Sequence, residues 1–336
     1  MGDKTHSRRM EAGVDSETLG RAFAYLSALE FHRTGRLPLV AARQWKWSWE
    51  REAWRRFQAG RSNVSEVAWP KLYWTLDDFS LRALFCALTL GRPEKGWEPP
   101  EPLRFLFTNP GRPLYSLISR FGRFILRSHP EDEGHDFVYF GDDTLYLMER
   151  SRDLLKLLLG SGVDQPCCLD LCCGGGGVGL ALPPFEGELL GVDLNSHAIE
   201  LARTTAQAQN LVNYRYRCMD TSEGLEGRFH LVFGNPPTLS PQLTGSDVFH
   251  ATGTWTQFEA LLDSVLGALH PRGRAVFTLF SQRTEGHDPA FSALEKRLKG
   301  ERGFLYSVRR VFPLKGGTEL CHCALELLPR GEIAAH

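Results

Sequence analysis

Short apolar runs of strand length alternate with longer amphipathic stretches along the second half of the chain. The stretches 144–159, 254–269 and 289–299 carry apolar residues at helical spacing. Alternating strands and helices are typical of an α/β protein with a mainly parallel sheet. The pattern therefore predicts a doubly wound, seven-stranded Rossmann-like sheet, with its ligand at the carboxyl ends of the strands. Its strands are expected at 167–172, 189–192, a run ending near 218, 229–234, 274–280, 304–311 and 320–327.

The first 130 residues show a different pattern. Helix-like runs lie at 16–33, 39–59 and 76–91, before a proline-rich connector and a few short apolar runs. Short helices with a strand pair suit a winged-helix-like module. The charged stretch 129–136 separates this region from the alternating pattern. We therefore predict a mainly helical accessory domain for substrate recognition at 1–130 and a second, ligand-binding domain at 136–330.

Glycines and acidic residues mark the ends of the predicted strands. The run 167–172 ends in four consecutive glycines, and Asp193 and Asp220 follow the next two runs. Glycines let a loop turn sharply and approach a ligand closely, and an acid at the tip of the second strand can accept ribose hydroxyls. A dinucleotide and a nucleoside such as S-adenosylmethionine (SAM) both fit. The dinucleotide spacing G-x-G-x-x-G is met by Gly174, Gly176 and Gly179.

The fourth apolar run helps to distinguish a dinucleotide from SAM, because Asn235-Pro236-Pro237 follows it. Here the sequence resembles the class I SAM-dependent methyltransferases, in particular those with an (Asp/Asn)-Pro-Pro-aromatic motif that methylate planar nitrogens. The segment from Asp170 to Gly176 is similar to the D-x-x-x-G-x-G of that family. The resemblance covers roughly 136–328. Thr238 stands where the family usually has an aromatic residue.

The resemblance implies SAM as the cofactor and assigns roles to individual residues. Asp193 falls at the ribose-binding position and Asp220 at the adenine-amino position, while a turn around Asp142 would close over the methionine end. The catalytic residues would be Asn235, Pro236 and Pro237. The cofactor-binding residues would be Phe140, Thr144, Asp170, Cys172, Gly174, Gly176, Asp193, Leu194, Asp220, Thr221 and Asn235.

The expected chemistry is methyl transfer to a nitrogen whose lone pair is spread into π orbitals. Two acceptors that bind both N–H bonds can re-aim that lone pair, and Asn235 Oδ1 and the Pro236 carbonyl would provide them. Proline has no N–H to compete and stiffens the loop. The proton acceptor is left open, and the nearby histidines are more often structural. Candidates for that proton are His197 and His250, and candidates for a replacement aromatic wall are Phe249, Trp255 and Phe280.

Charge distribution leaves several acceptors open. Residues 1–130 hold 21 Lys and Arg against 13 Asp and Glu, whereas the remaining chain holds 18 against 27. The basic first part, with Trp45, Trp49 and Trp54 among arginines, suits nucleic acid. We nevertheless expect these tryptophans to pack in a core, because a domain of this size needs large apolar side chains. The low net charge of −1 and Thr238 favour a smaller acceptor. We expect a small molecule or peptide in preference to an RNA or DNA base or a protein amide.

Two further classes of function remain as alternatives. A nucleotide-binding protein that has lost catalysis would not need the Asn-Pro-Pro segment, and a dehydrogenase would leave it unexplained. Eight cysteines invite a metal site, but adjacent pairs on a strand point to opposite faces, so we expect small buried side chains and no metal. No run of eighteen apolar residues occurs, and the polar start lacks a signal-peptide core. A cytoplasmic protein without a membrane segment is expected.

Overall fold

A computed structural model of the chain gives two compact units, and each is described by itself. One unit comprises residues 1–131 and 204–212, and the other comprises 132–203 and 213–336. The tryptophan-rich stretch, Phe249 and His250 lie outside the described residues. The structure describes residues 15–32, 84, 87–88, 97–109, 112–113, 115–128, 138–221, 224–239 and 253–329.

The described part of the first unit combines a helix with small antiparallel strand pairs. Helix α1 starts where the Asp15 carboxylate accepts the N–H of Thr18 at 2.8 Å. Its Phe23 ring stacks on Phe124 of the β4 hairpin strand, 4.8 Å between centroids. Gln209 also belongs to this unit and exchanges two hydrogen bonds with the backbone of Phe124, at 2.9 and 2.8 Å. Its elements are α1 (Ser16–Ala28), η7 (Glu101–Leu106), β1 (Phe107–Asn109), β2 (Arg112–Pro113), β3 (Tyr115–Arg120) and β4 (Arg123–Ser128).

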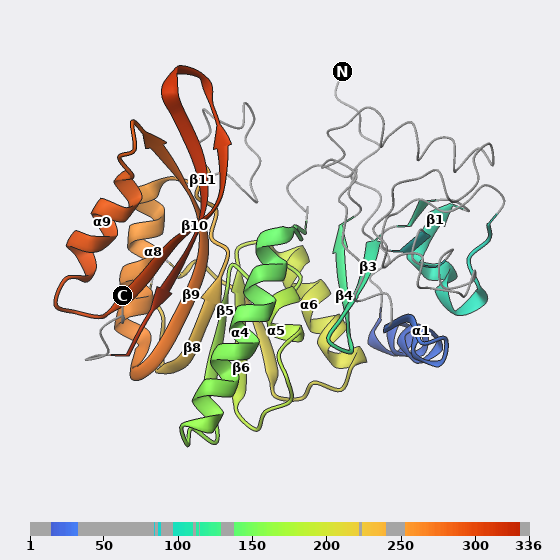
Figure 1. Cartoon of the computed structure of the whole chain (residues 1–336). Helices are drawn as coiled ribbons and strands as arrows, with labels where there is room; N and C mark the ends of the chain where they lie inside the picture. The colour runs from blue at the N-terminus through green and yellow to red at the C-terminus, as the bar shows by residue number, and fades with distance from the viewer. Residues whose placement is uncertain are drawn as a thin grey trace. The chain divides into compact units, whose positions relative to one another are not determined.

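The second unit is built on one seven-stranded sheet, in the order β10-β11-β9-β8-β5-β6-β7. The pairs from β7 across to β9 are parallel, whereas β11 runs antiparallel to both β9 and β10. This confirms the predicted Rossmann-like sheet, with an antiparallel end (Figure 1). Its strands are β5 (Cys167–Leu171), β6 (Glu188–Asp193), β7 (Tyr214–Cys218), β8 (Phe229–Gly234), β9 (Leu269–Thr284), β10 (Phe304–Pro313) and β11 (Thr318–Leu327).

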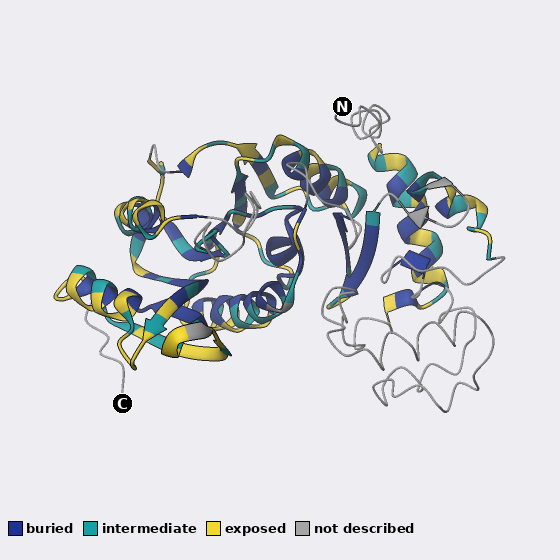
Figure 2. Cartoon of the chain, turned by 90° about the horizontal axis from the view of Figure 1, so that it is seen from above, coloured by how far each residue is buried: buried dark blue, intermediate teal, exposed yellow. Residues whose placement is uncertain are grey.

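Helices pack against both faces of this sheet. One face meets α4, because Arg150 of that helix pairs with Glu326 of β11 at 2.6 Å. The other face carries the core, where Phe258 and Leu262 of α8 and Leu294 of α9 pack with Cys323 and its odd-numbered neighbours in β11. Figure 2 shows buried strands between helices whose outer sides are exposed. The helices are α4 (Asp142–Gly160), α5 (Gly177–Leu180), α6 (Ser196–Ala208), α8 (Trp255–Ala268) and α9 (Pro289–Leu298), with η9 (Lys315–Gly317) between β10 and β11.

Local signals explain where these helices begin. Thr254 and Gln257 form a capping box ahead of α8. Asp288 accepts the N–H groups of Ala290 and Phe291 ahead of α9, and Pro289 occupies the first helical position. These signals agree with the starts expected from the sequence to within about two residues.

A bulge interrupts the outer strand of the sheet. Val308 of β10 pairs with Cys323 and Arg310 pairs with the next residue of β11, His322, so Arg309 is the extra residue. The Arg309 guanidinium lies over the Tyr146 ring of α4, 4.1 Å from its centroid.

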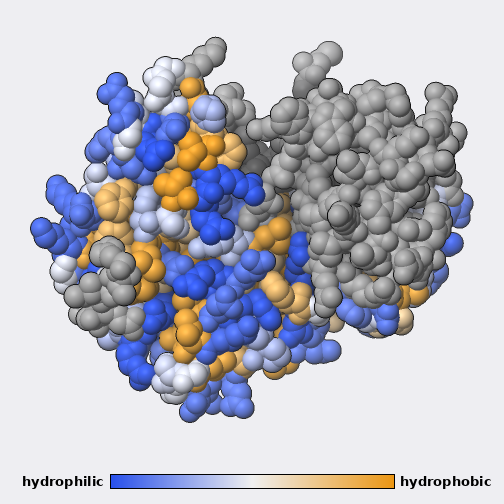
Figure 3. Space-filling model, in the orientation of Figure 1, coloured by the Kyte–Doolittle hydropathy of each residue, from blue (hydrophilic) through white to orange (hydrophobic). Residues whose placement is uncertain are grey.

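Figure 3 shows that the visible described surface is largely hydrophilic, with apolar side chains scattered between charged ones. No helix among the described residues is both long and apolar enough to cross a membrane.

Candidate active site

The glycine-rich loop after β5 turns through left-handed backbone. Cys172, Gly174 and Gly176 have φ angles of 53°, 51° and 74°. The two glycines adopt such angles without strain, whereas residues with a Cβ, such as Cys172, rarely do. Among the described residues, a Cβ added at Gly174 would meet only Cγ1 of Val138, at 3.9 Å, whereas one at Gly176 would lie 2.8 Å from the Tyr216 hydroxyl. The loop is therefore supported on one side and open on the other, which lets its backbone approach a ligand.

Asp170 braces this loop from inside the fold. Its side chain is 1% exposed, and Oδ2 accepts the N–H of Gly179 at 2.9 Å. Burial raises the pKa of Asp170 well above that of an ordinary carboxyl group. Asp170, Gly191 and Tyr216 are cross-strand neighbours in β5, β6 and β7. Asp170, one of the predicted cofactor-binding residues, is thus a buried support for the backbone of this loop.

Asp193 ends β6, and its carboxylate can accept more hydrogen bonds than the protein supplies. Its Oδ2 accepts the N–H of Gly174 at 2.8 Å, and its Oδ1 accepts the N–H of Asn195 at 2.9 Å. A carboxylate offers about four lone-pair sites, so two backbone donors leave capacity for hydroxyl groups. Desolvation raises the pKa of Asp193. The next residue, Leu194, is 55% exposed and places apolar surface beside this carboxylate.

The end of β7 brings Asp220 to the same edge of the sheet. Cys218 is the register partner of Asp193, so the residues that follow both strands lie at neighbouring strand ends. Asp220 is exposed and Thr221 is 8% exposed. An open glycine loop, an apolar surface and carboxylates together fit a nucleoside such as the adenosine part of SAM. Among the described residues, no group of three or more His, Cys, Asp or Glu could hold a metal ion.

Asn235 follows β8 next to this loop. Gly234 pairs with Leu171, so Asn235 and Cys172 leave adjacent strands at the same point. Asn235 Nδ2 donates to Asp143 Oδ2 at 2.8 Å, and the Thr278 hydroxyl donates to Asn235 Oδ1 at 2.7 Å. The predicted catalytic segment therefore has a fixed amide at its start. Pro236 behind it is buried, and Pro237 is half-buried.

Thr238 fastens the other end of the segment. Its hydroxyl oxygen accepts the N–H of Phe280 at 2.7 Å, so the residue that departs from the family pattern ties the loop to β9. The half-buried Phe280 ring packs against His322, 5.1 Å between centroids. Trp255 packs 5.1 Å from Phe258 beside the main core. Of the candidate aromatic residues that the structure describes, Phe280 is the one whose backbone hydrogen-bonds to the Asn-Pro-Pro-Thr loop.

The turn before α4 is ordered around its own helix start. Phe140 is 5% exposed. The Thr144 hydroxyl accepts the N–H of Gly141 at 3.2 Å, so it caps the helix. The helix begins at Asp142, two residues earlier than the start expected at Thr144. The candidate His197 lies near the start of α6 and is half-buried.

Two residues at the site were missed from the sequence, namely Asp143 and Thr278. Both are buried, with exposures of 5% and 0%. Thr278 is a polar residue within an apolar run, which is a signal that buried hydrogen bonding is required. Asp143 was hidden in a Gly-Asp-Asp-Thr turn that reads equally well as a helix cap.

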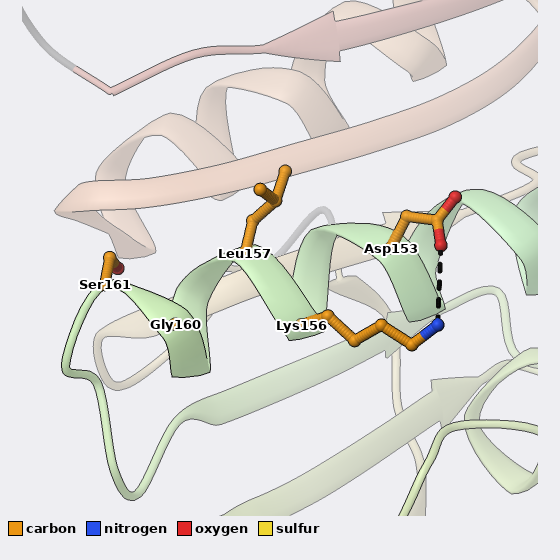
Figure 4. Close-up of a pocket in the computed structure, with 5 residues that line it drawn as sticks. All are labelled: Asp153, Lys156, Leu157, Gly160 and Ser161. Atoms are coloured by element: carbon orange, nitrogen blue, oxygen red, sulfur yellow. Dashed lines mark ion pairs between the residues drawn. The ribbon is translucent and has the colours of Figure 1, made fainter.

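A pocket elsewhere on α4 does not coincide with this site. It is lined by Asp153, Lys156, Leu157, Gly160 and Ser161 in the last turns of the helix, as Figure 4 shows. Helix α4 begins beside Asn235, and its 19 residues span about 28 Å at about 1.5 Å per residue. The pocket therefore lies near the opposite end of the sheet. The hydrogen-bonded groups locate the candidate site better than the pocket does.

Comparison with known proteins agrees with this arrangement. Residues 151–253 match the methyltransferase small domain family. This match supports a class I SAM-dependent methyltransferase. SAM is the cofactor of this class, and the match favours a methyltransferase over the dehydrogenase alternative.

Two relatives match parts of the chain. A release factor glutamine methyltransferase from Buchnera aphidicola is 29% identical over 29% of this chain and 34% of its own length. A Methanocaldococcus jannaschii protein named for N5-glutamine methyltransferase activity is 28% identical over 34% of this chain and 51% of its own length. The chain thus spans between a third and about half the length of these relatives. A SAM-dependent methyltransferase structure from Agrobacterium tumefaciens aligns with a TM-score of 0.47 at 15% identity, covering 67% of this chain and 73% of that one.

Proposed function

We propose that the chain is a SAM-dependent methyltransferase that acts on a planar nitrogen. The observation that carries the proposal is the Asn235 amide, which is fixed next to the glycine loop by Asp143 and Thr278. SAM supplies an electrophilic methyl carbon on a sulfonium. The protein then chiefly has to place the two reactants, which can contribute ~7–11 kcal/mol toward the barrier.

Cofactor binding is assigned to the ends of β5, β6 and β7. The backbone at Gly174 and Gly176 would lie against the methionine part, and Asp193 would accept the ribose hydroxyls. Leu194 would lie on the adenine ring, with Asp220 and Thr221 at its edge. Phe140 would close the methionine end, while Asp170, Cys172 and Thr144 shape the loop and the adjoining turn.

Acceptor binding is assigned to the Asn-Pro-Pro segment. Asn235 Oδ1 and the Pro236 carbonyl would accept the two N–H bonds of the acceptor, so the nitrogen lone pair points along the bond to be formed. The nitrogen would attack the methyl carbon in line while the bond from sulfur to that carbon breaks, so that S-adenosylhomocysteine leaves. The proton that the nitrogen then carries would pass to water. Pro237 keeps the segment rigid without adding a competing N–H.

A glutamine side-chain amide in a peptide or protein is the acceptor we favour. The names of the two partial relatives support this choice, and an amide NH2 has the two N–H bonds that the proposed grip requires. The earlier preference for a small molecule stays a prediction. An RNA or DNA base is the second candidate, supported by the excess of Lys and Arg in residues 1–130.

Three measurements test these assignments. Isothermal titration of the whole chain should detect SAM, with S-adenosylhomocysteine as a competitor, and absence of both would refute the cofactor. Transfer of radiolabelled methyl to glutamine-containing peptides should then be compared with transfer to RNA. A gel shift whose affinity falls steeply between two salt concentrations would favour nucleic acid, because phosphate contacts release counterions.

A further inference from the structure

The side-chain amide of Asn235 is held from two different elements. Asp143 comes from the first turn of α4, and Thr278 comes from the middle of β9. They lie 92 and 43 residues from Asn235 in the sequence, and their hydrogen bonds to it measure 2.8 and 2.7 Å. Three segments that are remote in the sequence therefore meet at one amide group.

The chemistry of these partners fixes which way the amide points. A carboxylate accepts hydrogen bonds and donates none, so only the NH2 end of Asn235 can face Asp143. A flipped amide would set its oxygen against the carboxylate oxygen. We infer that Asp143 and Thr278 are positioning residues that hold Asn235 Oδ1 toward the acceptor nitrogen, an inference that rests on the proposed function of Asn235.

The two partners have separate tasks. The Thr278 hydroxyl can either donate or accept, so alone it would tolerate both orientations of the amide. Asp143 selects the orientation, and Thr278 then fixes the position of the oxygen. A carbonyl oxygen has two lone pairs. With Thr278 on one of them, the other remains for a single N–H bond of the acceptor.

Asp143 is itself firmly placed. Its Oδ1 accepts the backbone N–H of Thr144 at 2.8 Å, and a helix N-terminus favours a negative charge. The turn just ahead of it contains Val138, the side chain nearest the open side of Gly174. Asp143 therefore connects the segment beside the glycine loop to the amide that would grip the acceptor.

Nuclear magnetic resonance of the side-chain amide tests the inference without any acceptor. The chain has six asparagines, so labelling with ¹⁵N-asparagine gives six NH2 pairs, and the Asn235 pair is the one lost in Asn235→Ala. We expect its protons to exchange with solvent about tenfold more slowly than those of the exposed Asn210. In Asp143→Asn, where residue 143 can donate as well as accept, that protection should fall.

Matched variants separate positioning from general destabilisation. Thr278→Val removes the hydroxyl at nearly constant volume and should also expose the amide protons, whereas Thr278→Ser should retain protection. Asp288→Asn changes a different carboxylate that also begins a helix and should leave the Asn235 resonances unchanged. The inference is overturned if Asn235 protection is the same in Asp143→Asn and in the wild type, or if Asp288→Asn alters it equally.

Methyl transfer to a glutamine peptide gives the functional readout. Asp143→Asn and Thr278→Val should each lower kcat about tenfold, with SAM affinity unchanged, because a misaligned amide impairs only the transfer step. In the Asn235→Ala background neither substitution should lower the remaining rate further. A full additional loss there would show that Asp143 acts independently of the amide. Failure of SAM to bind would instead refute the proposed function and leave the resonance test standing.

Discussion

The cofactor side and the acceptor side of the candidate site are held in different ways. On the cofactor side, backbone N–H groups of Gly179 and Gly174 bind the carboxylates of Asp170 and Asp193. On the acceptor side, side chains bind the side chain of Asn235. The first arrangement depends on backbone shape within one stretch of sequence. The second depends on three distant residues, so single substitutions can disturb it without altering the loop.

Substitution of Asn235 should produce the largest effect. We expect Asn235→Ala to slow methyl transfer by about 100-fold, because a small misplacement of the reacting nitrogen is enough to do so. SAM affinity should change little, since the cofactor side has its own supports. Transfer assays and isothermal titration on the same preparation measure both quantities. Parallel loss of SAM binding would show that the two sides are not separable.

Substitution of Asp193 should affect the other side. Asp193→Ala removes a carboxylate from the proposed ribose site and also frees the N–H of Gly174. Hydrogen bonds to a charged group contribute roughly 1.5–3 kcal/mol, so we expect SAM to bind about 10- to 100-fold more weakly. Isothermal titration measures this change. Unaltered affinity would contradict the assignment of Asp193.

Backbone support on the cofactor side can be tested at Gly191. A Cβ at this position would lie 2.3 Å from Cδ1 of Tyr216, so Gly191→Ala should destabilise the domain by roughly 1–3 kcal/mol. Gly160→Ala is the matched control, because a Cβ there meets no atom of the part of the chain that the structure describes within 4 Å. Thermal melting should show a lower transition for the first variant only. Equal melting of the two would mean that the Tyr216 ring moves aside freely.

The smallest expected effect is the dependence of SAM affinity on pH, which only the cofactor side should show. Desolvation raises the pKa of Asp193, so this carboxylate gains its proton at a higher pH than an ordinary Asp, near 3.9. SAM affinity should therefore weaken as the pH falls, starting above that ordinary range. The Asn235 amide does not titrate. Isothermal titration at several pH values measures the trend, and a flat profile would contradict it.

His230 provides the control for stability in that experiment. Its Nδ1 accepts the N–H of Cys167 at 3.2 Å, and burial, with the stacked His270, lowers the pKa of His230. The unfolded chain then takes up this proton more readily, so stability falls as the pH drops through about 6.5. Melting curves of His230→Gln should show a weaker pH dependence. SAM affinity that still declines in this variant would be attributable to Asp193.

The sequence predicted the strands of the second unit well and the surroundings of Asn235 only in part. Apolar runs revealed the strands of the sheet, because strands buried on both faces read as continuous apolar stretches. The glycine loop and Asp193 stand at strand ends, where order along the chain already implies position. Asp143 and Thr278 reach Asn235 only through tertiary packing, and no local spacing in the sequence predicts these contacts. Likewise, nothing in the local pattern showed that 204–212 groups with the first unit.

The bulge in β10 has a consequence for how the domain behaves in concentrated solution. An outer strand offers unpaired backbone groups to which another chain can add. The irregular register between Val308 and Arg310 divides this edge into two short pieces, so an incoming strand can follow the pattern over only part of its length. Exposed positive charge at Arg309 and Arg310 further opposes a second copy. The bulge and the two arginines thus oppose edge-to-edge pairing of strands from different molecules at β10, where Leu305 and Val311 are exposed.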